Sequence, residues 1–289
     1  MARLFSTSPD GMFWCNSSPD GWTIINVIGA YILTLYADLA IVMFCLVWKE
    51  WYYLHAILFL IASFLALWSH TKTMMTNPGA VPENAQPMNN NENGYCTKCD
   101  AFKPKSAYHC SKCKRCIVRM DHHCPYTNNC VGAHNQKFMI LFLLYCNIQA
   151  LYAIGLCVYY GSISKAFLER NIYNWLQRIA AFCFFFDGVL TLSFTGEMMR
   201  RQILSIYTGV GTIDRLKLAK GKKIAGGTPL PLSAIFGIDF PLLWLFPFDP
   251  FFENPEQILG FRQPKNLETP AVSSAETPLL ATSLQEDTI

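Results

Sequence analysis

Four long apolar segments constrain the fold of this chain more than any other feature of its sequence. They cover residues 22–48, 51–70, 138–160 and 179–199. Each reaches the roughly 20 residues that a helix needs to cross a hydrocarbon core of about 30 Å. A soluble chain of 289 residues, 52% hydrophobic and only 15% charged, has too little polar surface to cover four such helices. The sequence therefore predicts a protein that crosses the lipid bilayer four times.

Basic residues around these segments predict the orientation. Nine Lys or Arg residues lie between positions 71 and 137, and seven more lie between positions 200 and 223. Because basic loops stay on the cytosolic side, both regions are expected to face the cytosol, and four spans then place the N-terminus there too. Residues 1–21 contain no pattern of a removable signal peptide, so the first apolar segment is expected to direct membrane insertion. The net charge of +3 is too small to indicate a nucleic-acid partner.

The polar stretches complete the expected domain organisation. Residues 1–21 form a cytosolic N-terminus, 22–70 the first two helices, 71–137 a cytosolic linker with a cysteine-rich domain, and 138–199 the last two helices. Two tail segments follow, a membrane-associated one over 200–262 and a Ser, Thr, Pro and Glu-rich one over 263–289 that is expected to be disordered. The final Asp-Thr-Ile weakly matches peptides that bind PDZ grooves.

Seven of the twelve cysteines and three histidines lie between residues 96 and 130. They are Cys96, Cys99, His109, Cys110, Cys113, Cys116, His122, His123, Cys124 and Cys130. Such clustering favours metal ligation over the evenly placed disulfides of a small secreted domain. A structural zinc ion takes four nitrogen or sulfur ligands, so two complete sites use eight of the ten candidates. One cysteine and one histidine remain.

A spare thiol beside a spare imidazole has the composition of a nucleophile and its base. This directs attention to Asp121, His122, His123 and Cys124, where a histidine can take the thiol proton and a carboxylate can orient the imidazole. The spacing alone leaves a second interpretation open. The segment could be a purely structural double-zinc module that binds a partner, as in a membrane adaptor.

A more specific signal comes from the order of the residues between positions 96 and 138. The informative matches are Lys103-Pro104, His109-Cys110, Cys113, Cys116-Ile117, Met120-Asp121-His122-His123-Cys124-Pro125, Asn129-Cys130-Val131-Gly132, Asn135 and Phe138. This stretch resembles the cysteine-rich domain of the DHHC family of protein S-acyltransferases. The four-helix layout, with the domain between the second and third helices, extends the resemblance over about residues 20 to 260.

The resemblance implies a role for each ligand and for the remaining pair. It implies one structural zinc ion on Cys96, Cys99, His109 and Cys116, and a second on Cys110, Cys113, His123 and Cys130. It implies that Cys124 is the acylated nucleophile, that His122 is its base, and that Asp121 orients His122. The expected fold class is thus an all-α membrane protein with four transmembrane helices and a small cytosolic double-zinc domain between helices 2 and 3. Irregular loops and short β-hairpins are expected within this small domain.

The resemblance also implies the substrates. A fatty acyl-CoA such as palmitoyl-CoA is the expected donor, and cytosolic-facing proteins with juxtamembrane cysteines are the expected acceptors in a ping-pong cycle. Six basic residues are candidates for contacts with CoA phosphates. They are Lys98, Lys103, Lys114, Arg115, Arg119 and Lys137. Resemblance to animal members found on the Golgi implies the Golgi or another endomembrane as the location.

Several positions depart from the family pattern, and two acidic residues lie inside the predicted spans. The departures are Asn77 for Asp, Ser106 for Arg, Tyr126 for Trp, and the segment 211–214 for a Thr-Thr-x-Glu motif. They put the rate and the CoA contacts in question. Asp38 and Asp187 are expected either to line the acyl pocket or, as we favour, to link helices.

Overall fold

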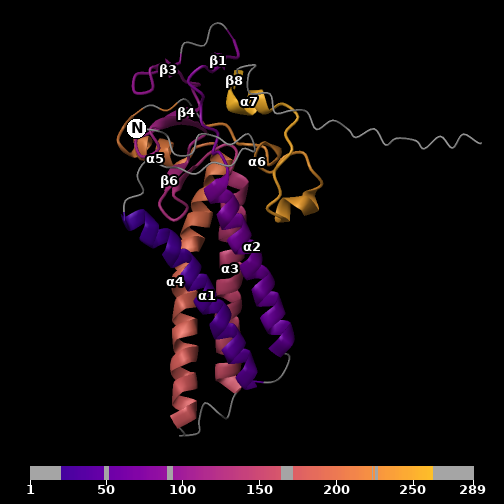
Figure 1. The fold of residues 1–289 in the computed structure, drawn as a ribbon. Helices are drawn as coiled ribbons and strands as arrows, with labels where there is room; N and C mark the ends of the chain where they lie inside the picture. The colour runs from indigo at the N-terminus through magenta and orange to yellow at the C-terminus, as the bar shows by residue number, and fades with distance from the viewer. Residues whose placement is uncertain are drawn as a thin grey trace, which may run out of the picture.

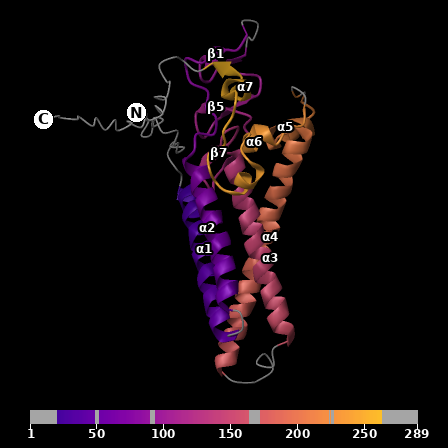
Figure 2. The same cartoon turned by 90° about the vertical axis from the view of Figure 1, so that its right-hand side faces the viewer.

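A computed structural model describes residues 21–48, 52–89, 94–163, 172–222, 224 and 227–262. Four long helices dominate it: α1 (Gly21–Trp48), α2 (Tyr52–Met75), α3 (Gln136–Ile163) and α4 (Ile172–Thr208). They run side by side, while the short strands and the small helices of the C-terminal part gather at one end of the bundle (Figure 1). Figure 2 shows the same arrangement from the side, so the molecule consists of a helix bundle and a compact polar module at one end.

All four helices are long and apolar enough to cross a membrane, as the sequence predicts. The candidate spans within them are Gly21–Val42, Tyr53–Met75, Gln136–Tyr159 and Arg178–Thr208. The helices are longer than the predicted apolar segments where they meet the polar module, because α2 continues to Met75 and α4 to Thr208. Thr73, Gln202 and Ser205 lie in these extensions and are buried, so the extra turns pack beneath the module.

The bundle packs through small residues and aromatic rings. Ile41 of α1, Phe59 of α2 and Phe184 of α4 form one buried cluster with residues of α3. Gly188 allows α4 to approach α3 closely, because a Cβ atom there would lie 3.3 Å from the Ala150 carbonyl oxygen. Ser63 of α2 donates a hydrogen bond of 2.8 Å to Asp38 of α1. Asp38 therefore links two helices, which is the interpretation favoured from the sequence.

The polar module corrects the expected all-α fold class. Short antiparallel pairs join β2 (Tyr95–Cys96) to β3 (Ala101–Phe102), β4 (Ala107–Cys110) to β5 (Arg115–Val118), and β6 (His122–Cys124) to β7 (Asn129–Val131). The tight turns between the paired strands use left-handed residues, among them Lys114 and Asn128. Each ligand set combines two cysteines three positions apart with two residues that face each other on paired strands, so the hairpins bring the four ligands together.

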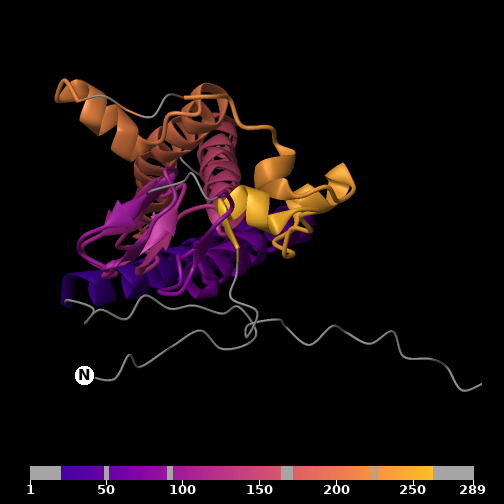
Figure 3. The same ribbon diagram turned by 90° about the horizontal axis from the view of Figure 1, so that it is seen from above.

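The C-terminal part returns to the module and covers it. After α4 come α5 (Thr212–Ala219), α6 (Ser233–Phe236), the 3-10 helix η2 (Pro241–Leu245), α7 (Pro255–Leu259) and β8 (Phe261–Arg262). Strand β8 pairs with β1 (Gln86–Pro87), so the end of the described tail is held against the linker before the module. Figure 3 shows these tail elements around the strands, above the ends of the long helices. The expectations for residues 1–20 and for the disordered tail at 263–289 with its PDZ-type end lie outside the described residues.

Candidate active site

The first cysteine-histidine cluster consists of a tight turn and one cross-strand pair. Cys96 is the last residue of β2 and Cys99 lies in the turn that follows, while His109 lies opposite Cys116 in the β4–β5 pair. The four ligand atoms lie within 4.8 Å of one another. His109 Nδ1 is 3.6 Å from Cys96 Sγ and 3.2 Å from Cys99 Sγ, and the Cys99 and Cys116 sulfurs are 3.8 Å apart.

The second cluster repeats this construction one hairpin further along the chain. Cys110 is the last residue of β4 and Cys113 lies in the β4–β5 turn, while His123 lies opposite Cys130 in the β6–β7 pair. Their ligand atoms also lie within 4.8 Å of one another. His123 Nδ1 is 3.4 Å from Cys113 Sγ and 3.7 Å from Cys130 Sγ, and the two sulfurs are 3.3 Å apart.

Both clusters have the ligand set and spacing of a closed zinc site. With zinc–sulfur and zinc–nitrogen bonds of about 2.3 and 2.0 Å, a tetrahedron places neighbouring ligand atoms about 3.5 to 3.8 Å apart. The distances above lie close to these values. Each cluster contains three sulfurs and one imidazole nitrogen, so a metal bound there would have no open position for substrate. Each cluster could therefore hold a metal ion with four protein ligands, and Cys124 belongs to neither cluster.

Cys124 lies at the end of β6, between the second cluster and the helix bundle. Its buried side chain packs with Val131, Met139 and Leu143. The neighbouring His122 donates a hydrogen bond of 2.8 Å from Nδ1 to Asp121 Oδ2. The other ring nitrogen, Nε2, is buried and makes no hydrogen bond within the described part of the chain. That nitrogen is therefore available to exchange a proton with a nearby thiol.

Electrostatics favours a charged pair at this point. Burial alone raises the pKa of the Cys124 thiol, but the interactions with His122 and Thr127 together more than offset it, so the net pKa is lowered. Burial likewise lowers the pKa of His122, while Asp121 and Cys124 raise it to about 10. Burial raises the pKa of Asp121, yet its hydrogen bonds to His122 and Thr212 leave it below the ordinary value. A thiolate beside an imidazolium, held by a carboxylate, is the state that these shifts favour.

Two side chains, one from α2 and one from the module, tie the loop that carries Cys124 to the end of α2. His70 of α2 is hydrogen-bonded through Nε2 to the Tyr126 carbonyl oxygen at 3.0 Å. Asn129 donates from its amide to the carbonyl oxygens of Thr73, Met74 and Thr76, at 3.0 to 3.2 Å. These carbonyls lie at the end of α2 and have no partner within the helix, so Asn129 caps α2 and anchors the loop to it.

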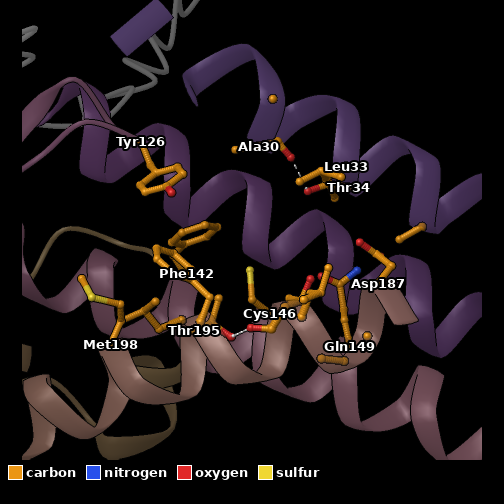
Figure 4. A pocket seen from close by; sticks show the side chains of 18 of the residues that line it. Ala30, Leu33, Thr34, Tyr126, Phe142, Cys146, Gln149, Asp187, Thr195 and Met198 are labelled. Atoms are coloured by element: carbon orange, nitrogen blue, oxygen red, sulfur yellow. Dashed lines mark hydrogen bonds between the residues drawn. The ribbon is translucent and has the colours of Figure 1, made fainter. Parts of the chain in front are cut away.

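A cavity of about 510 Å³ extends from Cys124 into the helix bundle. All four long helices line it, and most of the lining is apolar, including Phe59, Phe142 and Phe184. Figure 4 shows Cys146, Gln149 and Asp187 along its wall, with Tyr126 near the module. The size lies within the range of small-molecule sites. The position of Asp187 differs from the helix link favoured from the sequence, because this carboxylate lines the cavity.

The structure changes the set of basic residues that could contact CoA. Lys137 is buried and donates to the Phe248 carbonyl oxygen at 3.0 Å. Arg119 donates to the Ala234 carbonyl oxygen at 3.0 Å and to Gln136 Oε1 at 3.2 Å. Both side chains thus bind the protein itself, which makes them poor phosphate ligands. Lys98 and Lys114, by contrast, are exposed.

The positions that depart from the family pattern make specific contacts. Asn77 Oδ1 accepts from the backbone N–H groups of Gly79 and Ala80 at 3.0 and 2.8 Å, a role that an aspartate can also fill. The Thr212 N–H donates to Asp121 Oδ1 at 2.9 Å, so the segment 211–214 supports the site through its backbone. Tyr126 presents its ring to the cavity and to Phe194, with ring centroids 5.2 Å apart.

Sequence reasoning did not identify Gln202. This buried residue of α4 donates from Nε2 to Asp121 Oδ2 at 2.7 Å, across 81 positions of the chain. The signal in the sequence is faint, because an amide near the end of an apolar segment is unremarkable. Only the packing of α4 beneath the module brings it to Asp121.

Four candidate membrane helices lie beneath a module with two metal-capable clusters. The thiol of Cys124 lies at the mouth of an apolar cavity between these helices. Together these features define a membrane-embedded thiol site. The family model described as DHHC palmitoyltransferase matches residues 89–219. The human palmitoyltransferase ZDHHC3 is 34% identical over 261 residues, which cover 83% of this chain and 85% of that protein. The rat palmitoyltransferase ZDHHC7 is 34% identical, with 79% of each chain covered. The chain belongs to the DHHC palmitoyltransferase family.

Proposed function

We propose that this protein is a protein-cysteine S-acyltransferase that moves a long-chain acyl group from acyl-CoA to Cys124 and then to a cysteine of a substrate protein. The relatives reported above are named palmitoyltransferases, which supports the reaction class. One observation carries the assignment of the site. The thiol of Cys124 lies next to a histidine, and the apolar cavity begins at this same cysteine.

The first half of the cycle forms an acyl-enzyme. His122 accepts the Cys124 proton at Nε2, and the thiolate attacks the thioester carbonyl of acyl-CoA. The bond between the acyl carbon and the CoA sulfur breaks, and the CoA thiolate leaves with the proton from the imidazolium. Asp121 holds Nδ1 of the ring, which fixes the tautomer that leaves Nε2 free to accept.

The second half reverses these roles with a different thiol. The cysteine of a substrate protein gives its proton to His122 and attacks the thioester on Cys124, and the Cys124 sulfur leaves as a thiolate. One thioester is exchanged for another in each step, so the enzyme mainly supplies thiolate and position. The acceptors in this proposal are proteins with cysteines close to the cytosolic face of the membrane.

The cavity binds the acyl chain in this proposal. Each methylene that leaves water contributes about 0.8 kcal/mol, so a long chain gains most of its binding free energy between the helices. The bulky, charged CoA part remains outside, at the level of the polar module. An active thiol at the boundary between lipid and water serves both halves of the donor.

The two clusters bind structural zinc ions, and the module faces the cytosol. Zinc supplies four fixed bonds per site and thereby stabilises the hairpins on both sides of Cys124. The module and the described tail lie at the same end of the bundle, where the basic residues are concentrated, which supports the cytosolic orientation. A reducing cytosol also keeps the thiols unoxidised. The Golgi is the membrane that we propose for this enzyme.

The lowered pKa of Cys124 leads to a testable pH dependence. An ordinary thiol has a pKa of about 8.5, and the fraction present as thiolate falls about tenfold for each pH unit below that value. We expect the alkylation rate of Cys124 by iodoacetamide to fall much less than this between about pH 8 and pH 6, because its net pKa is lowered. His122→Ala should restore the steep decline. Site-resolved mass spectrometry of the alkylated peptide measures both rates, and a steep decline in the unchanged protein would contradict the thiolate pair.

Gln149, a polar residue in the mostly apolar wall of the cavity, leads to a prediction about the chain length of the acyl donor. Gln149 is buried in this wall, and its Nε2 makes no hydrogen bond within the described residues. It lies ten residues along α3 from Met139, which packs against Cys124, so its depth is roughly 15 Å. An apolar chain that reaches Gln149 leaves its amide desolvated and unpaired, at about 1 to 3 kcal/mol.

Gln149→Leu is therefore expected to raise kcat/KM for palmitoyl-CoA relative to octanoyl-CoA, by about tenfold. The longer chain gains because it contacts the new leucine, while the shorter chain ends before it. Gln257→Leu, the same change at an exposed position of α7, provides the matched control. An unchanged ratio in Gln149→Leu would show that the acyl chain does not reach this part of the cavity.

A further inference from the structure

The buried carboxylate of Asp121 has a partner that the mechanism above does not use. Its Oδ2 atom accepts one hydrogen bond from His122 Nδ1 at 2.8 Å and another from Gln202 Nε2 at 2.7 Å. Oδ1 accepts from the Thr212 N–H. Gln202 is completely buried and belongs to α4, so a membrane helix contacts the same oxygen that orients His122.

Gln202 is itself held by a chain of buried polar groups. Its Oε1 accepts from Gln136 Nε2 of α3 at 3.2 Å. Gln136 Oε1 accepts in turn from Arg119 Nη2 at 3.2 Å, and Arg119 Nη1 donates to the Ala234 carbonyl oxygen at 3.0 Å. This amide relay connects the module, α3, α4 and the tail segment at α6.

The two ends of the relay fix the orientation of both amides. A carboxylate can only accept hydrogen bonds, so Gln202 must present its NH₂ group to Asp121. A guanidinium can only donate, so Gln136 must present its oxygen to Arg119. The remaining oxygen of Gln202 then faces the NH₂ group of Gln136. Reversing either amide would break two contacts at once, which means that the relay has one favourable arrangement.

We propose that Gln202 is a positioning residue for acyl transfer, which acts through Asp121 on His122. This inference rests on the proposed function of Cys124. By donating to Oδ2, Gln202 prevents the carboxylate from rotating away from the imidazole, and the relay holds Gln202 in place. His122 then keeps Nε2 directed at the thiol during both halves of the cycle. The two amides carry no charge, so they orient the carboxylate without neutralising it.

The test compares single-turnover acylation of Cys124 by palmitoyl-CoA in the full-length protein and in Gln202→Met. Methionine has a similar length and volume but no donor. Loss of a hydrogen bond that orients a functional side chain typically reduces activity about 10- to 100-fold, and we expect a decrease of this size in the maximal rate. The half-saturating palmitoyl-CoA concentration should change less than about twofold, because Gln202 is not part of the cavity.

Two further variants separate hydrogen-bond donation from packing. Gln202→His can still donate from Nε2, so it should recover much of the rate lost in Gln202→Met. Gln202→Glu keeps the shape but places a second carboxylate against Asp121, and it should be slower than Gln202→Met. Arg201→Met, a neighbouring residue of α4 that pairs with the exposed Glu197, is the matched control and should acylate at the unchanged rate.

Zinc content and thermal unfolding are measured for every variant. A Gln202→Met protein that retains two zinc ions and acylates within about twofold of the unchanged protein overturns the proposal. If Gln202→Met loses zinc, Gln136→Met provides the test, since it removes the support of Gln202 but leaves the contact with Asp121. Acylation at the full rate in Gln136→Met then overturns the relay. Failure of the unchanged protein to acylate Cys124 at all instead contradicts the proposed function.

Discussion

Cys124→Ser is expected to reduce acyl transfer from palmitoyl-CoA to a protein thiol by at least about 10⁴-fold, because the nucleophile is lost. A serine hydroxyl stays protonated at neutral pH and gives a stable ester, so neither half of the thioester exchange proceeds. The cavity and both clusters remain, since Cys124 is a ligand of neither cluster. The protein should therefore fold, bind two zinc ions and still bind acyl-CoA.

The matched control for this variant is Cys183→Ser. Cys183 is an exposed cysteine of α4 that lies in neither cluster and does not line the cavity. The control should transfer at the unchanged rate. Transfer measured as hydroxylamine-sensitive label on an added cysteine peptide separates the two variants. Appreciable turnover in Cys124→Ser would mean that another thiol carries the acyl group.

Cys113→Ala is expected to remove one zinc ion and, with it, all measurable transfer. Cys113 Sγ lies 3.4 Å from His123 Nδ1 and 3.3 Å from Cys130 Sγ, at the centre of the second cluster. Apparent binding free energies of structural zinc in small domains are about 10 to 16 kcal/mol, comparable to the stability of a whole domain. Loss of one of four ligands should therefore disorder the β6–β7 hairpin, which carries both His123 and Cys124.

Zinc analysis of the purified protein, together with the transfer assay, measures this effect. Ser111→Ala is the matched control, because Ser111 is exposed in the same turn and is not a ligand. It should keep two zinc ions and full activity. A Cys113→Ala protein that retains both zinc ions and transfers normally would contradict the structural role of the second cluster.

The parts of the fold that could be predicted follow from constraints that are local in the sequence. A bilayer requires a minimum helix length, and this requirement alone identifies the four spans. The valence of zinc limits how ten ligand candidates can be divided, and this arithmetic leaves one cysteine and one histidine over without saying which. The resemblance then supplies the pairing, and the structure brings together the atoms of each expected ligand set.

The parts that could not be predicted depend on which distant segments pack together. The pairing of β8 with β1 joins positions about 175 residues apart, and nothing in either two-residue strand specifies its partner. Arg119 and Lys137 look like solvent-facing phosphate ligands in the sequence, yet the tail covers them and supplies backbone carbonyl oxygens as partners. Gln202 gains its role only because α4 continues beyond its apolar segment. In each case the role of the residue or strand depends on a contact between distant segments, which no local sequence pattern predicts.

The departures from the family pattern can be interpreted in the same way. The segment 211–214 contacts Asp121 through a backbone N–H, which any residue except proline can provide. Asp214 additionally accepts from the Tyr108 hydroxyl at 2.5 Å and so ties α5 to the β4–β5 hairpin. The substitutions therefore preserve the contacts that hold Asp121. This makes an inactive, adaptor-like relative the weaker interpretation.

The most direct test of the central role of Cys124 is a pulse and chase with labelled palmitoyl-CoA. The unchanged protein is labelled, separated from free palmitoyl-CoA and then mixed with a cysteine peptide. If Cys124 carries the acyl group, hydroxylamine-sensitive label appears on the Cys124 peptide and moves to the added peptide at the rate of overall turnover. Protein that retains two zinc ions but never forms this thioester, or whose label never leaves Cys124, would contradict this role.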